Sequence, residues 1–277
     1  MFLFTVGHVV HKLPEGESVV GVATLADEIY VLRRKERDQV EVYDVIGYRL
    51  QRRLSVPDIC GFTDMTSCEH YRWVYISDHV IECIHRLDVH GAVTRWAVND
   101  KPHTLSVNAA HNVLVTCREV RKIKEFSSHG DIVRELTLPG DVISPLHATQ
   151  LTNGQYIVCH GRRDDAVHRV CKISDDGRHI VESHGGQRGS GTGQYRVPIH
   201  LAVDNDGFVF VVDFNNRRVK LLSPMLDYIR DVVSCDELTW KPTRLCLDVN
   251  RRRLYVTASE IVKDGELTTG RVVLFSV

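Results

Sequence analysis

The chain lacks the sequence features of membrane proteins and of small domains that are held together by disulfides or metal ions. No apolar run approaches the roughly 18 residues that a membrane-spanning helix needs. The eight cysteines are dispersed among the 277 residues, and no two of them form a C-x-x-C pair, which excludes a zinc knuckle or a RING array. The N-x-S/T acceptor of glycosylation is also missing. We therefore expect free, mostly buried thiols and a cytoplasmic protein that does not bind membranes.

The chain also lacks an excess of charge of either sign. Thirty-five Lys and Arg residues oppose 36 Asp and Glu residues, so the formal net charge is −1. Such a chain has no overall field that attracts nucleic acid or an anionic membrane, and any binding of this kind must come from a local patch. The apolar fraction of 43% is that of an ordinary folded protein, which excludes a disordered chain.

An internal repeat organises the sequence. Its clearest copy begins at Pro198, where two apolar strand-like runs are joined by an Asp206-Gly207 turn and followed by two more short strands. One buried-type residue marks the second strand of every copy, and these residues recur roughly every 40–55 positions. They are Tyr30, Tyr75, Leu114, Tyr156, Phe210 and Tyr255.

Six copies of a four-stranded unit predict an all-β protein, a six-bladed β-propeller with four-stranded antiparallel blades. We expect residues 1–277 to form one domain. The sixth copy stops at its third strand, 271–277, and the N-terminal segment 1–6 is the candidate for its missing fourth strand. Such a closure would remove the exposed strand edges at the two ends of the chain.

Blade five carries the most specific motifs. A glycine-rich run, 185–195, precedes Pro198, and a D-x-x-N-x-R element follows as Asp213, Asn216 and Arg218. No helix is expected after the glycine run, so we interpret it as a linker and not as a phosphate loop. We interpret the Asp, Asn and Arg side chains as a brace within a turn.

These motifs resemble NHL repeats, and the whole chain is similar to the C-terminal propeller of tripartite-motif proteins. The match is specific in blade five and degenerate elsewhere, since blades two and three lack the D-x-x-N-x-R element. The resemblance implies a non-enzymatic module that recruits a protein or peptide, as in substrate recognition for ubiquitin-linked regulation, and it implies no cofactor. A fold alone does not fix a function, because propellers have many.

The predicted blade topology places several basic residues on one face. Second-to-third loops and blade-to-blade linkers share this face, and we predict that its arginines form the rim that binds a partner. The rim residues are Arg33, Arg34, Arg37, Arg162, Arg163 and Arg217. RNA binding in post-transcriptional regulation is the alternative, although interleaved acidic residues such as Asp164 and Asp165 weaken it.

Three histidines follow blade-opening prolines in successive blades and are expected at the mouth of the central channel. They are His103, His147 and His200. Three imidazoles and a water make a catalytic zinc site, and the peptide-amidating lyase is a related propeller with histidine-bound zinc. A histidine-metal lyase or hydrolase is therefore the second alternative. His103 follows its proline directly, whereas the other two lie one residue further on, so we favour a channel lining without a metal.

Overall fold

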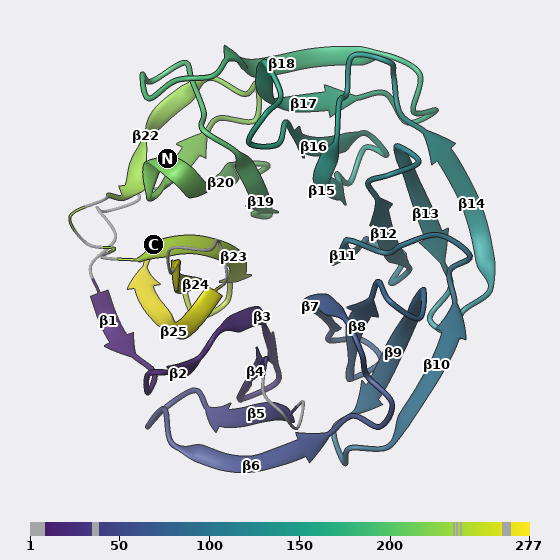
Figure 1. Cartoon of the computed structure of the whole chain (residues 1–277), viewed down its shortest axis with the longest axis vertical. Helices are drawn as coiled ribbons and strands as arrows, with labels where there is room; N and C mark the ends of the chain where they lie inside the picture. Colours follow the sequence, from purple (N-terminus) through teal and green to yellow (C-terminus); the bar gives the residue numbers. More distant parts are fainter. Residues whose placement is uncertain (1–8, 35–38, 235, 237, 239, 262–266) are drawn as a thin grey trace.

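A computed structural model describes residues 9–34, 39–234, 236, 238, 240–261 and 267–277 of the chain. Six antiparallel sheets are arranged like blades around a common centre, as Figure 1 shows. In blades one to five the four strands are hydrogen-bonded in chain order, with the first strand innermost. The six-bladed all-β propeller predicted from the sequence is confirmed.

In each of the first three blades the strands follow one another from the channel outwards. Blade one contains β3 (Val19–Leu25), β4 (Glu28–Arg33), β5 (Gln39–Asp44) and β6 (Leu50–Ser55). Blade two contains β7 (Phe62–Cys68), β8 (Trp73–Asp78), β9 (Cys83–Asp88) and β10 (Val93–Ala97). Blade three contains β11 (Thr104–Val107), β12 (Val113–Cys117), β13 (Lys122–Phe126) and β14 (Ile132–Thr137).

The remaining blades follow the same plan. Blade four contains β15 (Pro145–Gln150), β16 (Tyr156–His160), β17 (Val167–Ile173) and β18 (Ile180–Gln187). Blade five contains β19 (Pro198–Val203), β20 (Val209–Asp213), β21 (Arg218–Leu222) and β22 (Tyr228–Val233), with the short 3-10 helix η1 (Phe214–Asn216) after β20. Blade six contains β23 (Lys241–Asp248), β24 (Arg253–Ile261) and β25 (Leu267–Ser276).

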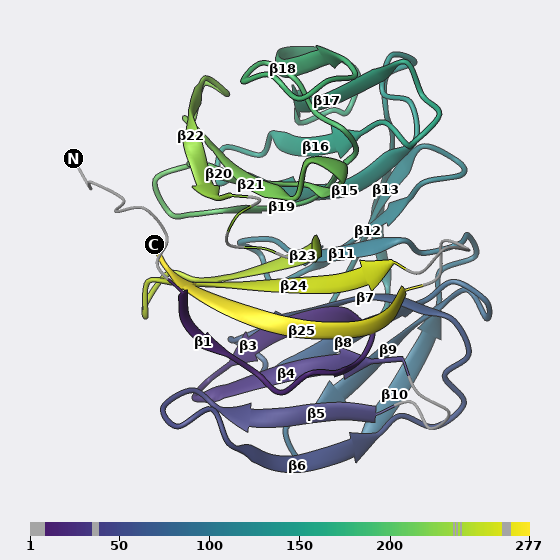
Figure 2. The ribbon, with the colours of Figure 1, turned by 60° about the vertical axis from the view of Figure 1, so that its left-hand side comes forward.

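The N-terminal segment completes blade six, as predicted. Strands β1 (Val9–Lys12) and β2 (Gly16–Glu17) both pair antiparallel with β25, and Figure 2 shows β1 beside β25. The segment 1–6 that the sequence suggested for this role lies outside the described residues. The strand that can be seen to close the ring begins at Val9.

Burial between the blades explains why the period is visible in the sequence. The marker residues of the second strands, Tyr30 to Tyr255, are all buried, and five of the six are aromatic. Burying one such side chain contributes about 1.5–3 kcal/mol to folding. Each blade presents one such residue because successive sheets pack face to face around the ring.

The motif residues of blade five have the bracing role that we expected. The Asp213 carboxylate accepts hydrogen bonds from Asn216 Nδ2 at 2.7 Å and from Arg218 Nε at 2.9 Å. The buried Lys220 ammonium donates to main-chain carbonyls of the glycine-rich linker, including that of Gln194 at 2.9 Å. The linker is therefore held in place by side chains of the blade that follows it.

Seven of the eight cysteines lie in the described part of the chain, and all seven are free thiols. Five of them are buried, and Cys235 lies outside the described residues. Burial raises the pKa of Cys117 and of Cys171 to about 12, so these two thiols stay protonated at neutral pH. No helix in the described residues is long and apolar enough to span a bilayer.

Candidate functional site

The central channel is lined at one level by a single residue from each inner strand. Each of these residues lies near the start of its inner strand and pairs with a residue near the end of the second strand of the same blade. The partners in blades one to six are residues 32, 77, 116, 159, 212 and 257. The lining residues are Gly21, Asp64, Thr104, His147, His200 and Arg244. A Cβ at Gly21 would lie 2.7 Å from the Met65 Cβ, so blade one has no room for a side chain there.

Asp64 and Arg244 form an ion pair across this channel. Arg244 Nε lies 2.8 Å from Asp64 Oδ1, and Arg244 also donates to the carbonyl of Thr63 at 2.6 Å. Leu105 N–H donates to Asp64 Oδ2 at 2.9 Å. Burial raises the pKa of Asp64, but the charge of Arg244 and the imidazole of His200 outweigh it, and the pKa lies well below its ordinary value. Asp64 is therefore a carboxylate.

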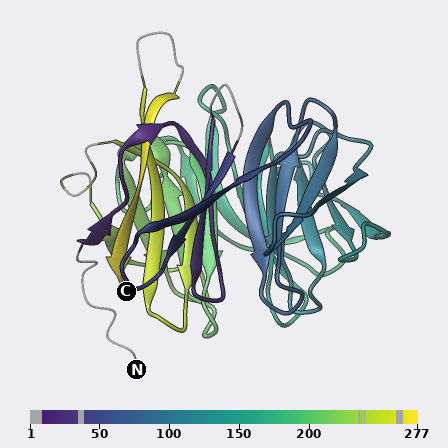
Figure 3. The ribbon, with the colours of Figure 1, turned by 90° about the horizontal axis from the view of Figure 1, so that it is seen from below.

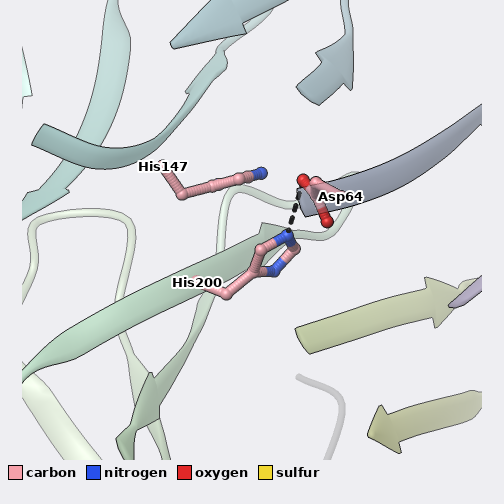
Figure 4. Close-up of side chains that lie close together, drawn as sticks. All are labelled: Asp64, His147 and His200. Carbon is pink, nitrogen blue, oxygen red and sulfur yellow. Dashed lines mark ion pairs between the residues drawn. The ribbon is translucent and has the colours of Figure 1, made fainter. Parts of the chain in front are cut away.

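His147 and His200 approach Asp64 from the neighbouring strands β15 and β19, as Figure 4 shows. The two ring centroids lie 3.8 Å apart, and His200 Nε2 lies 3.6 Å from Asp64 Oδ2. Both rings are buried. Burial lowers the pKa of each imidazole. The neighbouring His200 lowers the pKa of His147 further, and the charge of Arg244 lowers the pKa of both. Both imidazoles are therefore neutral at pH 7.

The two histidines and Asp64 have the residue types of a metal site, but their hydrogen bonds do not fit one. His200 Nδ1 accepts from Leu245 N–H at 3.3 Å, so the neutral ring carries its proton on Nε2, the nitrogen that faces Asp64. His147 Nε2 lies 3.1 Å from the carbonyl of Leu105 and must donate to it. The free lone pair on His147 Nδ1 and the Asp64 carboxylate together offer two ligands, whereas a catalytic zinc site takes three protein ligands.

His103 does not join this group. It lies one residue before the level of the channel ring, as its position directly after Pro102 suggested, and its Nε2 lies 3.4 Å from Arg118 Nη1. Burial lowers the pKa of His103, and the charge of Arg118 lowers it further. The expectation that His103, His147 and His200 meet at the channel mouth is therefore corrected. Only His147 and His200 meet, and the third residue beside them is Asp64.

Two cavities open from the channel, one toward each face of the disc that the six blades form. Figure 3 shows this disc from its edge. The larger, of about 560 Å³, lies at the far ends of the inner strands and extends inward to His147 and His200. The smaller, of about 270 Å³, lies at the starts of the inner strands and reaches the second-to-third loops. We call the smaller one the arginine pocket, because Arg118, Arg162, Arg163 and Arg244 line it.

The predicted rim arginines have different environments. Arg162 and Arg163 are exposed and line the arginine pocket, and Arg217 is exposed in the corresponding loop of blade five. Arg34 is exposed and lies over the Phe62 ring, 5.7 Å from its centroid. Arg37 lies outside the described residues.

Arg33 is a correction to the predicted rim. Its side chain is 3% exposed and pairs with Glu41 at 2.6 Å. It also donates to the carbonyls of Pro14 and Gly270, so it joins blade one to the strands that close the ring. A buried guanidinium with these partners cannot contact a partner protein.

Positive charge gathers around the arginine pocket. Burial lowers the pKa of Arg118, and the nearby charge of Arg162 lowers it further. Burial likewise lowers the pKa of Lys241, and three neighbours lower it further, namely Arg163, Arg196 and Arg217. Sequence analysis missed Arg118, Arg196 and Lys241, because they are far apart in the sequence and only the ring brings them together.

Comparison with known proteins gives one match in sequence and many in fold. The chain is 28% identical over 107 residues to human NHL repeat-containing protein 3, a match that spans 36% of this chain and 30% of that protein. No family model matches the chain.

Among solved structures the chain is similar to an aldose sugar dehydrogenase from Streptomyces coelicolor, with a TM-score of 0.68 and 13% identity over 97% of this chain and 98% of that one. It is also similar to virginiamycin B lyase from Staphylococcus aureus, with a TM-score of 0.63 and 10% identity over 95% and 98% of the two chains. At this identity the likeness shows the fold alone. The ring of six blades shows that the chain is a six-bladed β-propeller, and its repeat motifs and the match to the human protein show that it is similar to NHL-repeat propellers.

Proposed function

We propose that this propeller is a non-enzymatic interaction module that binds an acidic segment of a partner protein at the face carrying the arginine pocket. One observation carries the proposal: Arg162 and Arg163 border a cavity, and within the described residues neither guanidinium has an acidic partner. Unpaired cations around a concavity attract anionic groups and speed their association. The chain as a whole is close to neutral, so this attraction is local.

The structure of the loop supports this role. Arg162 N–H donates to the Asp165 carboxylate at 2.6 Å, and the main-chain carbonyl of Arg163 accepts from Arg188 at 2.9 Å. These contacts fix the backbone and leave both guanidinium groups to a ligand. A loop that is already ordered loses less entropy when a partner binds.

One finer proposal rests on the resemblance alone. The similarity to tripartite-motif propellers supports substrate recognition for ubiquitin-linked regulation, with the catalytic domain on another chain or segment. A cytoplasmic location also remains our proposal. The lyase and dehydrogenase among the similar folds do not favour catalysis in this chain, since the two channel histidines offer a single lone pair between them, on His147 Nδ1, and not the ligand set of a catalytic metal site.

The test is binding of a fluorescein-labelled octaglutamate peptide, followed by anisotropy at low and physiological salt. We expect binding that weakens as salt rises, and a loss of roughly tenfold or more in affinity in the double variant Arg162→Glu/Arg163→Glu. The control is Arg178→Glu, an exposed arginine in a third-to-fourth turn on the opposite face, which should bind like the parent.

The same assay with labelled oligouridine separates the RNA alternative. Tighter, arginine-dependent binding of oligouridine than of octaglutamate would replace the peptide partner by RNA. Equal binding of octaglutamate and of an uncharged Gly-Ser peptide would overturn the proposal, as would an unchanged affinity in the double variant.

A further inference from the structure

The arginine pocket joins a cationic wall to an apolar one. Its cations come from the second-to-third loops of blades three and four, at Arg118, Arg162 and Arg163. The apolar wall is formed by residues of blades one, four and five, namely Val20, Leu146, Val197, Ile199 and Phe214. None of the described residues that line the pocket is acidic. A ligand that fits both walls has an anionic end and an apolar body.

The charge of the pocket is only partly compensated. Arg244 is neutralised by Asp64 on the channel side, at 2.8 Å. Arg118 contacts the neutral His103, and Arg162 lies close enough to lower the pKa of Arg118 by repulsion. Within the described residues, no carboxylate pairs with the guanidinium of Arg118, Arg162 or Arg163. An anion with more than one negative charge would relieve this repulsion better than a single carboxylate.

The volume of the pocket limits the ligand. About 270 Å³ suits one side chain and not a folded segment, which would have to remain outside on the rim. Phe214, at the start of η1, lies in the wall and can contact an aromatic ring. The Phe214 ring is in turn covered by the Lys241 ammonium, 5.0 Å from its centroid.

We propose that the arginine pocket binds a phosphate monoester carried on an aromatic side chain, as in phosphotyrosine. A phosphate monoester carries about −1.5 to −2 charges near pH 7 and three acceptor oxygens, which suit several guanidinium donors at once. The aromatic ring then lies against the apolar wall. This inference rests on the proposed function, since the modified side chain would belong to the partner protein.

The test is calorimetric titration with N-acetyl-phosphotyrosine amide. The comparison ligands are N-acetyl-tyrosine amide, N-acetyl-phosphoserine amide and inorganic phosphate. We expect the phosphotyrosine derivative to bind about tenfold more tightly than phosphoserine or phosphate, because only it fills both walls, and the unphosphorylated derivative not to bind.

The matched variants are Arg118→Gln inside the pocket and Arg178→Gln on the opposite face. Loss of one charge-assisted hydrogen bond should weaken phosphotyrosine binding about tenfold in Arg118→Gln and leave Arg178→Gln unchanged. Circular dichroism and thermal melting show whether Arg118→Gln folds. Should it not fold, the milder Arg162→Gln change in an exposed loop residue serves the same purpose.

Three results would overturn the inference. One is equal binding of inorganic phosphate and phosphotyrosine, which means an adventitious anion only. Another is phosphotyrosine binding that does not depend on Arg118 or Arg162. The last is octaglutamate binding that needs Arg162 and Arg163 without any phosphotyrosine binding, in which case the proposed function stands and this inference fails. If neither probe binds, both proposals fail.

Discussion

Arginines that form ion pairs inside this protein have a structural role, whereas exposed arginines are available to a partner. Arg33 and Arg244 are both part of the fold, one joining the ring at its closure and the other crossing the channel to Asp64. Arg162 and Arg163, by contrast, have exposed side chains over a cavity. Charge in the sequence is therefore a poor guide to function until burial and partners are known.

The pair of Asp64 and Arg244 gives a prediction for single residues. Arg244→Met removes the half-buried partner of the buried Asp64 carboxylate and should lower the free energy of unfolding by about 3 kcal/mol, because that carboxylate is left without its counter-charge. Urea denaturation monitored by circular dichroism measures this change.

The double variant Asp64→Asn/Arg244→Met is the control for that prediction. It removes both charges and should recover a large part of the lost stability. An Arg244→Met variant as stable as the parent would contradict the argument. So would a double variant whose loss of stability equals or exceeds the summed losses of Asp64→Asn and Arg244→Met.

Among the strands, the closure of blade six depends on a close approach between backbones. Gly270 in β25 pairs with Gly16 in β2, and a Cβ at Gly270 would lie 2.4 Å from the backbone nitrogen of Val19. The carbonyl of Gly270 also accepts from Arg33 Nη1 at 3.1 Å. A side chain there would push the closing strand away from blade one.

Gly270→Ala should therefore destabilise the ring, by about 1–3 kcal/mol as for overpacking elsewhere. The matched control is Gly140→Ala, because Gly140 is exposed and a Cβ there would meet no atom within 4 Å. Thermal melting of the two variants makes the comparison. Equal melting temperatures for both would mean that the closure is not tight at this position.

At the scale of the whole molecule, buried histidines are expected to set the response to acid. Burial is the largest cause lowering the pKa of seven histidines, five of them buried and two half-buried, and the pKa of His160 falls to about 4. They are His85, His103, His147, His160, His168, His184 and His200. In the unfolded chain a histidine has a pKa near 6.5, as it does in model compounds.

The sign of the effect follows from these values. As the pH falls below about 6.5, the histidines bind protons in the unfolded chain but remain neutral in the folded protein. Their contribution to the free energy of unfolding is therefore complete above about pH 6.5 and is lost toward pH 4. We expect the free energy of unfolding to fall by at least about 3 kcal/mol between pH 7 and pH 5. Guanidinium denaturation at several pH values measures it.

Two variants identify the groups responsible for that slope. His160→Gln should reduce the pH dependence by about one proton, whereas replacement of the exposed His90 by Gln should leave it unchanged. A denaturation midpoint that does not move between pH 7 and pH 5 would exclude the buried histidines as the cause.

Sequence by itself determined the number of blades, the manner of closure and the register of the channel histidines. These follow from local chemistry, since apolar alternation and a large buried residue in the second strand repeat in every copy, and that residue is aromatic in five of the six. Arg244 was also within reach of such reasoning, because it lies two residues after Pro242 just as His147 and His200 lie two residues after Pro145 and Pro198.

Only the tertiary structure decided which side chains meet. Closing the ring brings Asp64 to Arg244, which is 180 residues away in the sequence, and collects Arg118, Arg162 and Arg163 around one cavity. It also buries Arg33 under the N-terminal segment. A repeat specifies each blade from neighbouring residues, whereas a channel and its mouth are made from one residue of each blade, and their distances exist only once the ring is closed.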